Sequence, residues 1–340
     1  MKYDYKYFKK RIKSFLKRRV LPAPISVIVP IYNGERTLRK CLDKLLEQTQ
    51  RRIKIICVND GSTDGTEQIL KEYSQKDRRI VVINQENGGR SAARNMGLLA
   101  VKTKYVMFCD ADDWYESNMC ENILDAIEKS NADLAICGIK MIYESHMEMM
   151  ESDENYYKVY FDGKRKVNDE VISRTNGSVC NKIFRMDIIR RNKINFPQGL
   201  HTAEDFYFYN AYMSVSKTAY FLNQKLYNYR RHPDSIMSAN FDKKKVSIDD
   251  ILVAEKLFDF YKKTGFLNKH KDLFWRQWIA SFWASYKYSA KKYHWMVKEE
   301  AWRFLDKYYE RYKPTDSEIV KWKNDIVKTL NKIKKEDERG

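Results

Sequence analysis

Three aspartates close a short apolar segment with a spacing that could hold a cation. Asp110, Asp112 and Asp113 end the run YVMFCDADD. Carboxylates one residue apart on a tight turn can reach a single point, and such oxygen ligands suit a hard divalent ion such as Mg²⁺ or Mn²⁺. The alternative is structural: Asp110 ends a strand, and Asp112 or Asp113 caps a helix near Ser117. The motif alone leaves both interpretations open.

A second acidic pair, in the segment EDFYF, has the chemistry of a general base. Glu204 and Asp205 are followed by Phe206 and Phe208, whose apolar rings could raise the pKa of Asp205 by desolvation. A carboxylate in such a place can remove a proton from a hydroxyl group. The alternative is a helix start with Thr202 as N-cap and the two acids favoured by the helix dipole. A capped helix could also present Asp205 to a crevice, so the two interpretations are compatible.

The elements that must position these acids alternate between two periods. Short apolar segments, typical of strands buried on both faces, occupy residues 25–30, 53–60, 80–84 and 105–110. Apolar residues at helical spacing lie between and after them, in helices expected after Thr37, from Thr66, over about 91–101 and over 117–129. This order predicts an α/β fold with a mostly parallel sheet flanked by helices. Ligands of such sheets bind beyond the carboxyl ends of the strands, so the polar residues there should line one crevice.

Four motifs carry a family resemblance. VIVPIYNGERTLRKCLDKLLEQT, VNDGSTDGT, ENGGRSAARNMGL and FCDADDW follow one another in the order and spacing of the N-terminal half of a family 2 glycosyltransferase. The resemblance extends over about 25–236, is weakest over 140–180, and implies the Rossmann-like GT-A fold with a C-terminal helical appendage outside it. We therefore expect a basic amphipathic helix at 1–22, a catalytic domain at 23–238 and a helical region at 239–340. Within the catalytic domain, 23–115 would be the nucleotide-binding half and 116–238 the acceptor-binding half.

The resemblance also implies roles for particular residues. The donor would be a nucleotide-diphosphate sugar, by family habit a UDP-sugar, contacted by Pro30, Tyr32, Glu35, Asp60, Arg94 and Asp110. Mn²⁺ or Mg²⁺ would be held by Asp112 with Asp110, and His232 is a candidate third ligand. Arg230 and Arg231, in YNYRRHPDSI, would face the diphosphate.

The catalytic base implied by the resemblance is Asp205, preferred over Glu204 because the second acid of this pair usually has that role in the family. The reaction would be an inverting transfer of a hexosyl or N-acetylhexosaminyl group to a glycan or lipid-linked acceptor in bacterial-type surface polysaccharide synthesis. Asn181 and Lys182 match a family segment near the acceptor, although Lys182 could also be a solvated charge. The alternative function is a non-catalytic protein that binds nucleotide sugars or anionic surfaces through a decayed transferase fold.

The formal net charge of +18 predicts a phosphate-bearing or anionic partner. Nucleic acid is not expected, because no recognised reader motif is present. Basic and aromatic residues alternate in the first twenty positions, which suits an anionic membrane surface. The tryptophan-rich stretch 273–296 could bind lipid in the same way, or could pack on the catalytic domain or on a second subunit of a homodimer.

The six cysteines form no CxxC pair, which indicates reduced thiols and a cytoplasmic location. No segment has the roughly 20 apolar residues of a membrane-spanning helix, and the basic N-terminus lacks the apolar core of a secretory signal. We therefore expect membrane contact, if any, to be peripheral and at the inner face of the cell membrane.

Overall fold

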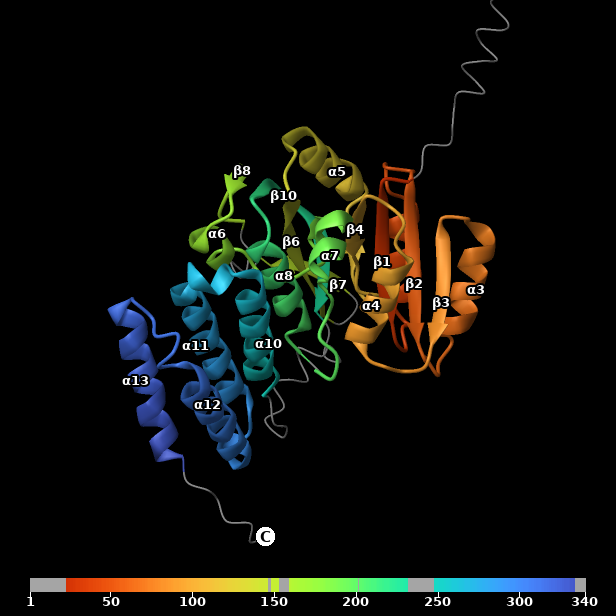
Figure 1. The fold of residues 1–340 in the computed structure, drawn as a ribbon. Helices are drawn as coiled ribbons and strands as arrows, with labels where there is room; N and C mark the ends of the chain where they lie inside the picture. Colours follow the sequence, from red (N-terminus) through yellow and green to blue (C-terminus); the bar gives the residue numbers. More distant parts are fainter. Residues whose placement is uncertain (1–22, 146–147, 153–158, 201, 232–247, 334–340) are drawn as a thin grey trace, which may run out of the picture.

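The computed structural model describes residues 23–145, 148–152, 159–200, 202–231 and 248–333. The expected basic helix at 1–22 lies outside these residues. One mixed sheet forms the centre of the molecule, and helices cover it (Figure 1). Its strands lie in the order β3 (Ile80–Gln85), β2 (Ile53–Asp60), β1 (Ile25–Ile31), β4 (Tyr105–Phe108), β9 (Lys182–Arg185), β6 (Leu134–Ser145), β10 (Thr218–Arg231) and β5 (Trp114–Tyr115). In addition, β7 (Glu148–Ser152) pairs with β6, and β8 (Gly163–Lys166) pairs with β10.

The N-terminal half of the sheet is parallel, as the apolar segments predict. Strand β1 lies between β2 and β4, and β2 pairs with β3, all in parallel register. Every residue of β1 is buried, because helices cover both faces of a sheet of this kind. The connecting helices are α2 (Leu38–Leu46), α3 (Thr66–Lys76) and α4 (Arg90–Ala100). Thr37 is at the N-cap position of α2 as expected, although its side chain makes no capping hydrogen bond.

The second half of the sheet mixes strand directions and brings distant segments together. Strand β9 is antiparallel to both β4 and β6, whereas β10 is parallel to β6 and antiparallel to β5. The β5–β10 pairing places Trp114 opposite Asn228. The segment that follows Asp112 therefore lies beside the segment that leads to Arg230. The helices of this half are α5 (Met119–Ser130), α6 (Asp169–Ser173), α7 (Met186–Asn192) and α8 (Glu204–Ser214).

The C-terminal helices form an aromatic core of their own against α8. They are α10 (Asp249–Thr264), α11 (Lys271–Tyr288), α12 (His294–Tyr308) and α13 (Ser317–Lys332), with short 3₁₀ turns at Phe266–Asn268 and Lys291–Tyr293 (Figure 1). The side chains of α11 that could have faced lipid are mostly buried, namely Phe274, Trp275, Trp278 and Phe282. The packing interpretation therefore holds for these four residues. Among the aromatic side chains of α11, only Trp283 is exposed, at 38%.

The C-terminal helices are joined to α8 by polar contacts as well as by apolar packing. Gln277 of α11 donates a hydrogen bond of 2.7 Å to Asn210 of α8, and both side chains are buried.

The six cysteines are all free and buried, which agrees with the expectation of reduced thiols. None of the helices in the described part of the chain has the length and apolar content needed to cross a bilayer.

Candidate active site

A cavity of about 660 Å³ lies beyond the carboxyl ends of the parallel strands, where the fold predicts a ligand. Most of the predicted site residues line it, although they come from distant parts of the chain. They are Pro30, Tyr32, Asp60, Arg94, Asp110, Asp112, Glu204, Asp205 and Arg230. Glu35 and Arg231 do not line this cavity, and His232 lies outside the described residues.

Arg94 connects the two acidic motifs of the cavity. This α4 residue is 1% exposed, and its guanidinium contacts Asp110 Oδ1 and Glu204 Oε1, each at 2.7 Å. Its face also packs on the Phe196 ring, 5.2 Å from the centroid. Burial disfavours the charge of Arg94, but the charges of Asp110 and Glu204 outweigh it and raise its pKa. Arg94 therefore fixes both acids in place.

The aspartates after β4 have different surroundings. Burial disfavours the ionised form of Asp110, but the positive charges of Arg94 and Arg90 outweigh it and lower its pKa. Asp112 lines the cavity and is partly exposed. Asp113 is 1% exposed and accepts hydrogen bonds from the Tyr227 hydroxyl and from the Arg230 backbone at 2.8 Å.

The buried member of this group, Asp113, has a structural role. Burial, with the negative charges of Asp112 and Asp110, raises its pKa well above the usual range. It does not cap the next helix, because the N-cap of α5 is Asn118. Asp113 instead ties the turn after β4 to β10, so Asp110 and Asp112 are the acids available to a ligand.

The first turn of α8 presents Asp205 to the cavity. Glu204 is 3% exposed and is occupied by Arg94 and by Arg90, whose Nε lies 3.1 Å from Glu204 Oε1. Asp205 is partly exposed and has no ion pair among the described residues. Burial, followed by the negative charge of Glu204, raises the pKa of Asp205 to about 6. Its partial exposure and this raised pKa suit Asp205 as a proton acceptor near neutral pH, whereas Glu204 is held by the two arginines.

The prediction that Thr202 caps α8 is wrong. The N-cap residue is Ala203, in the left-handed conformation with φ of 62°, and its side chain makes no capping bond. The Thr202 backbone N–H instead donates to Asp249 Oδ2 at 3.0 Å. Because Asp249 opens α10, the helical region holds the segment that precedes Asp205.

The carboxylates of Asp60 and Glu35 accept hydrogen bonds from nearby loops, mainly from backbone N–H groups. The Asp60 carboxylate accepts hydrogen bonds from Gly88 and Gly89 N–H at 2.9 and 2.8 Å, and from the Gln85 amide at 2.7 Å. It thereby shapes the loop before α4, where Gly89 adopts a φ of 84° that favours glycine. Glu35 accepts from Gly65 N–H at 3.0 Å, outside the cavity lining. The structure thus gives Glu35 a role in the turn before α3.

Sequence reasoning missed Arg90 and left two interpretations of Lys182 open, of which the structure excludes one. Arg90 lines the cavity one helical turn before Arg94, and this i, i+4 spacing in GGRSAAR is a signal that could have identified it. Lys182 is fully buried, so the solvated interpretation is wrong. Its ammonium donates to Asn176 O at 2.9 Å and to Asn181 Oδ1 at 2.8 Å, and burial lowers its pKa to about 7.

The carboxylate oxygens in the cavity fit a Mg²⁺-type ion that is also coordinated by a substrate. No group of three or more His, Cys, Asp or Glu side chains with metal-binding geometry occurs in the described ranges. Mg²⁺ is commonly held by one or two carboxylates together with substrate phosphates. Asp112, with the second oxygen of Asp110, matches this chemistry.

The two arginines predicted to face the diphosphate lie in different surroundings. Arg230 lines the cavity, whereas Arg231 does not, and its guanidinium lies 6.0 Å from the Tyr229 ring centroid.

A mixed sheet with two acidic motifs at one cavity is the arrangement that the resemblance to a GT-A glycosyltransferase predicts. Residues 26–192 match the family model described as glycosyl transferase family 2. Glycosyltransferase GlyG of Streptococcus pneumoniae is 32% identical over 234 residues, which cover 64% of this chain and 74% of GlyG. The chain belongs to glycosyltransferase family 2.

The chain is also similar to other named glycosyltransferases and to one solved structure. The putative glycosyltransferase EpsH of Bacillus subtilis is 34% identical over 63% of this chain and 62% of EpsH. The poly(ribitol-phosphate) beta-glucosyltransferase of Bacillus spizizenii is 29% identical over 73% of this chain and 40% of that enzyme. The chain thus matches less than two thirds of the length of these two relatives. The crystal structure of S. aureus TarS 1–349 in complex with UDP-GlcNAc aligns with a TM-score of 0.57 at 20% identity, over 84% of this chain and 89% of TarS 1–349, which shows the fold alone.

Proposed function

We propose that the protein transfers a sugar from a nucleotide-diphosphate sugar to a hydroxyl group, with inversion at the anomeric carbon and with Asp205 as the general base. The observation that carries this proposal is that Asp205 and the Asp110–Asp112 pair line one cavity. The buried Arg94 holds Asp110 and the neighbour of Asp205 in fixed positions. An acceptor hydroxyl between these groups has a base on one side and a diphosphate leaving group on the other.

In the proposed reaction the Asp205 carboxylate takes the proton of the acceptor hydroxyl. The hydroxyl oxygen forms a bond to the anomeric carbon as the bond from that carbon to the diphosphate oxygen breaks. The nucleoside diphosphate leaves with the electron pair, and Asp205 is left protonated. A pKa of about 6 leaves Asp205 ionised at neutral pH yet basic enough to accept this proton.

Charge that develops on the leaving diphosphate has to be neutralised. A divalent ion held by Asp112 with Asp110 would act as a Lewis acid on those oxygens. Arg230 is 9% exposed and lines the same cavity, so its guanidinium can add a permanent positive charge. Tyr32, which is 55% exposed at the rim, offers a ring on which the base of the nucleotide can stack.

The relatives support a proposal for the donor and acceptor classes. We infer a UDP-sugar, either hexosyl or N-acetylhexosaminyl, because the TarS fragment of the same fold was crystallised with UDP-GlcNAc. The similarity to the poly(ribitol-phosphate) glucosyltransferase supports a surface-polymer or lipid-linked acceptor. We further propose that the protein acts on such an acceptor at the inner face of the cell membrane.

Calorimetric titration with UDP, GDP, CDP and dTDP tests the donor part of this proposal. Each nucleotide is titrated with Mn²⁺ and again with EDTA, on the wild type and on Asp112→Asn. We expect one nucleotide to bind with Mn²⁺ and to lose affinity about tenfold or more both with EDTA and in Asp112→Asn. Equal affinity in Asp112→Asn and wild type with Mn²⁺ present would remove Asp112 as a ligand. No binding of any nucleotide would overturn the proposed function.

A further inference from the structure

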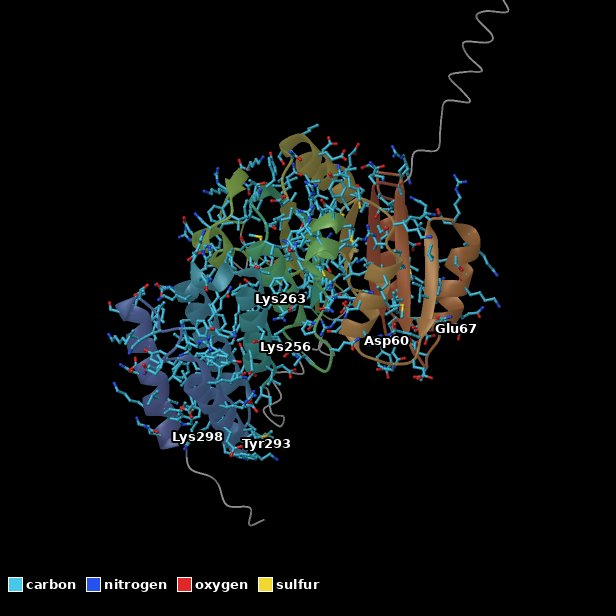
Figure 2. The ribbon with its side chains drawn as sticks, in the orientation of Figure 1. Asp60, Glu67, Lys256, Lys263, Tyr293 and Lys298 are labelled. Atoms are coloured by element: carbon cyan, nitrogen blue, oxygen red, sulfur yellow. The ribbon has the colours of Figure 1, made fainter. Side chains whose placement is uncertain are left out.

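A second cavity, of about 350 Å³, lies on the other side of α8 and carries excess positive charge. Lys193 follows α7, and Lys256 and Lys263 lie two helical turns apart on α10. Figure 2 labels these two lysines at separate points along α10. Three exposed lysines face this cavity against one acid, Asp259.

These lysines make no ion pair within the part of the chain that the structure describes, which sets them apart from many surface cations of this protein. Three further polar residues line this cavity, which we call the lysine cavity: Asn192, Asn195 and Tyr207. Burial, followed by the charge of Asp259, raises the pKa of Tyr207 to about 12, so its hydroxyl remains a donor. The lining thus combines charged and neutral hydrogen-bond donors.

The wall of this cavity is rigid. Asn95 of α4 exchanges two hydrogen bonds of 2.8 Å with the Phe196 backbone, next to Asn195. The Phe196 ring stacks on Phe208 of α8 with centroids 4.3 Å apart. The same Phe196 ring lies 5.2 Å from the Arg94 guanidinium on the active-site side. A ligand here would meet donors whose backbone is already positioned.

The helix α8 relates the two cavities. Asp205 lines the active site and Tyr207 lines the lysine cavity, two residues later. Two residues correspond to about 200° around an α-helix whose diameter with side chains is about 10 Å. An acceptor would therefore have to extend around α8 to contact both Asp205 and the lysine cavity.

We propose that the lysine cavity binds a phosphate group of an extended acceptor chain whose hydroxyl is glycosylated in the active site. This inference rests on the proposed function for the reaction but not for the binding. Phosphate is favoured because several lysines and neutral donors converge on a concave site without a second acid to balance them. A concave site suits a single group on a chain better than the flat face of a membrane.

Fluorescence anisotropy with a labelled glycerol-phosphate oligomer tests this proposal, with an uncharged oligoglycerol of equal length as ligand control. The test variant is Lys256→Gln/Lys263→Gln. The matched control is Lys262→Gln/Lys269→Gln, which removes the same charge from exposed lysines outside the cavity lining. We expect the test variant to bind the oligomer about tenfold more weakly, and the control to stay within about twofold of wild type. The uncharged oligomer should bind equally weakly to all three proteins.

Three outcomes would overturn the proposal. The first is an equal loss in the test and control variants, which would indicate general attraction by net charge. The second is unchanged binding in the test variant. The third is a loss in the test variant for phosphatidylglycerol vesicles but not for the oligomer, which would assign the lysines to a membrane. UDP titration of the same proteins separates this proposal from the proposed function: if UDP does not bind while the oligomer distinguishes the variants, the phosphate site stands and the transferase proposal falls.

Discussion

Arg94 and Glu204, 110 residues apart in the chain, form a buried ion pair with 2.7 Å between Nη1 and Oε1. The second guanidinium nitrogen of Arg94 contacts Asp110. One side chain of α4 thus joins the acidic turn after β4 to the first turn of α8. The positions of Asp110 and of the helical turn that carries Asp205 are set by the same residue.

Replacement of Arg94 should destabilise the whole fold. Arg94→Met leaves Asp110 and Glu204 as buried or partly buried carboxylates without their partner, which we expect to lower the free energy of unfolding by about 3–5 kcal/mol. Urea unfolding followed by circular dichroism measures this change. The matched control is Arg39→Met, which removes an exposed pair with Glu72 and should leave the unfolding free energy nearly unchanged. An Arg94→Met protein as stable as wild type would show that the Arg94 bridge is unimportant for stability.

The rate of transfer should depend on the ionisation of Asp205. Because burial and Glu204 raise its pKa to about 6, the single-turnover rate should rise tenfold per pH unit below about 6 and level off above it. Asp205→Asn should lower the rate by about 10²–10⁴-fold with unchanged UDP affinity. A rate within about twofold of wild type in Asp205→Asn would place the base elsewhere.

The same raised pKa has a consequence for stability. The folded protein holds the Asp205 proton more tightly than the unfolded chain, so the contribution of this group to stability falls as the pH rises from about 4 to about 6. Asp205→Asn should therefore be more stable than wild type at pH 7, by about 1 kcal/mol after allowance for its partial exposure. Glu204→Gln should be less stable, because it loses contacts to Arg90 and Arg94. Thermal unfolding at pH 5 and pH 7 measures whether Asp205→Asn is more stable, and Glu204→Gln less stable, than wild type.

Lys182 should act as a positioning residue for the loop that lines the active site at Ser178 and Cys180. Lys182→Met leaves the oxygens of Asn176 and Asn181 without their donor, and we expect a loss of about 2 kcal/mol in unfolding free energy. Since burial lowers the pKa of Lys182 to about 7, the unfolded chain retains this proton at higher pH than the folded chain does. Wild type should therefore gain stability relative to Lys182→Met as the pH rises from about 7 to about 9.

The control for this prediction is Lys166→Met, at an exposed position of β8. It should change neither the unfolding free energy nor its pH dependence by more than about 0.5 kcal/mol. A Lys182→Met protein that unfolds with the same free energy and the same pH dependence as wild type would contradict the buried role of this lysine.

The sequence by itself determined the elements of the parallel half and the identity of the acids beyond its strands. Buried strands such as β1 and the helices after them follow from local apolar periodicity, which every short segment carries within itself. The position of Asp110 and Asp112 after β4 follows in the same way, because a strand end is a local feature. The expected α/β class and the C-terminal helices are confirmed on this basis.

Only the tertiary structure decided which charges meet. The order of the strands places β9 between β4 and β6, and no local pattern predicts that neighbour. The partners of Arg94, the burial of Lys182 and the contact of Asp249 with Thr202 all depend on such long-range pairing. Likewise, the aromatic spacing of α11 suits a lipid surface and a protein core equally, and the packing of α12 against it made the choice. Periodicity specifies that a face is apolar, whereas what covers that face is decided by the rest of the chain.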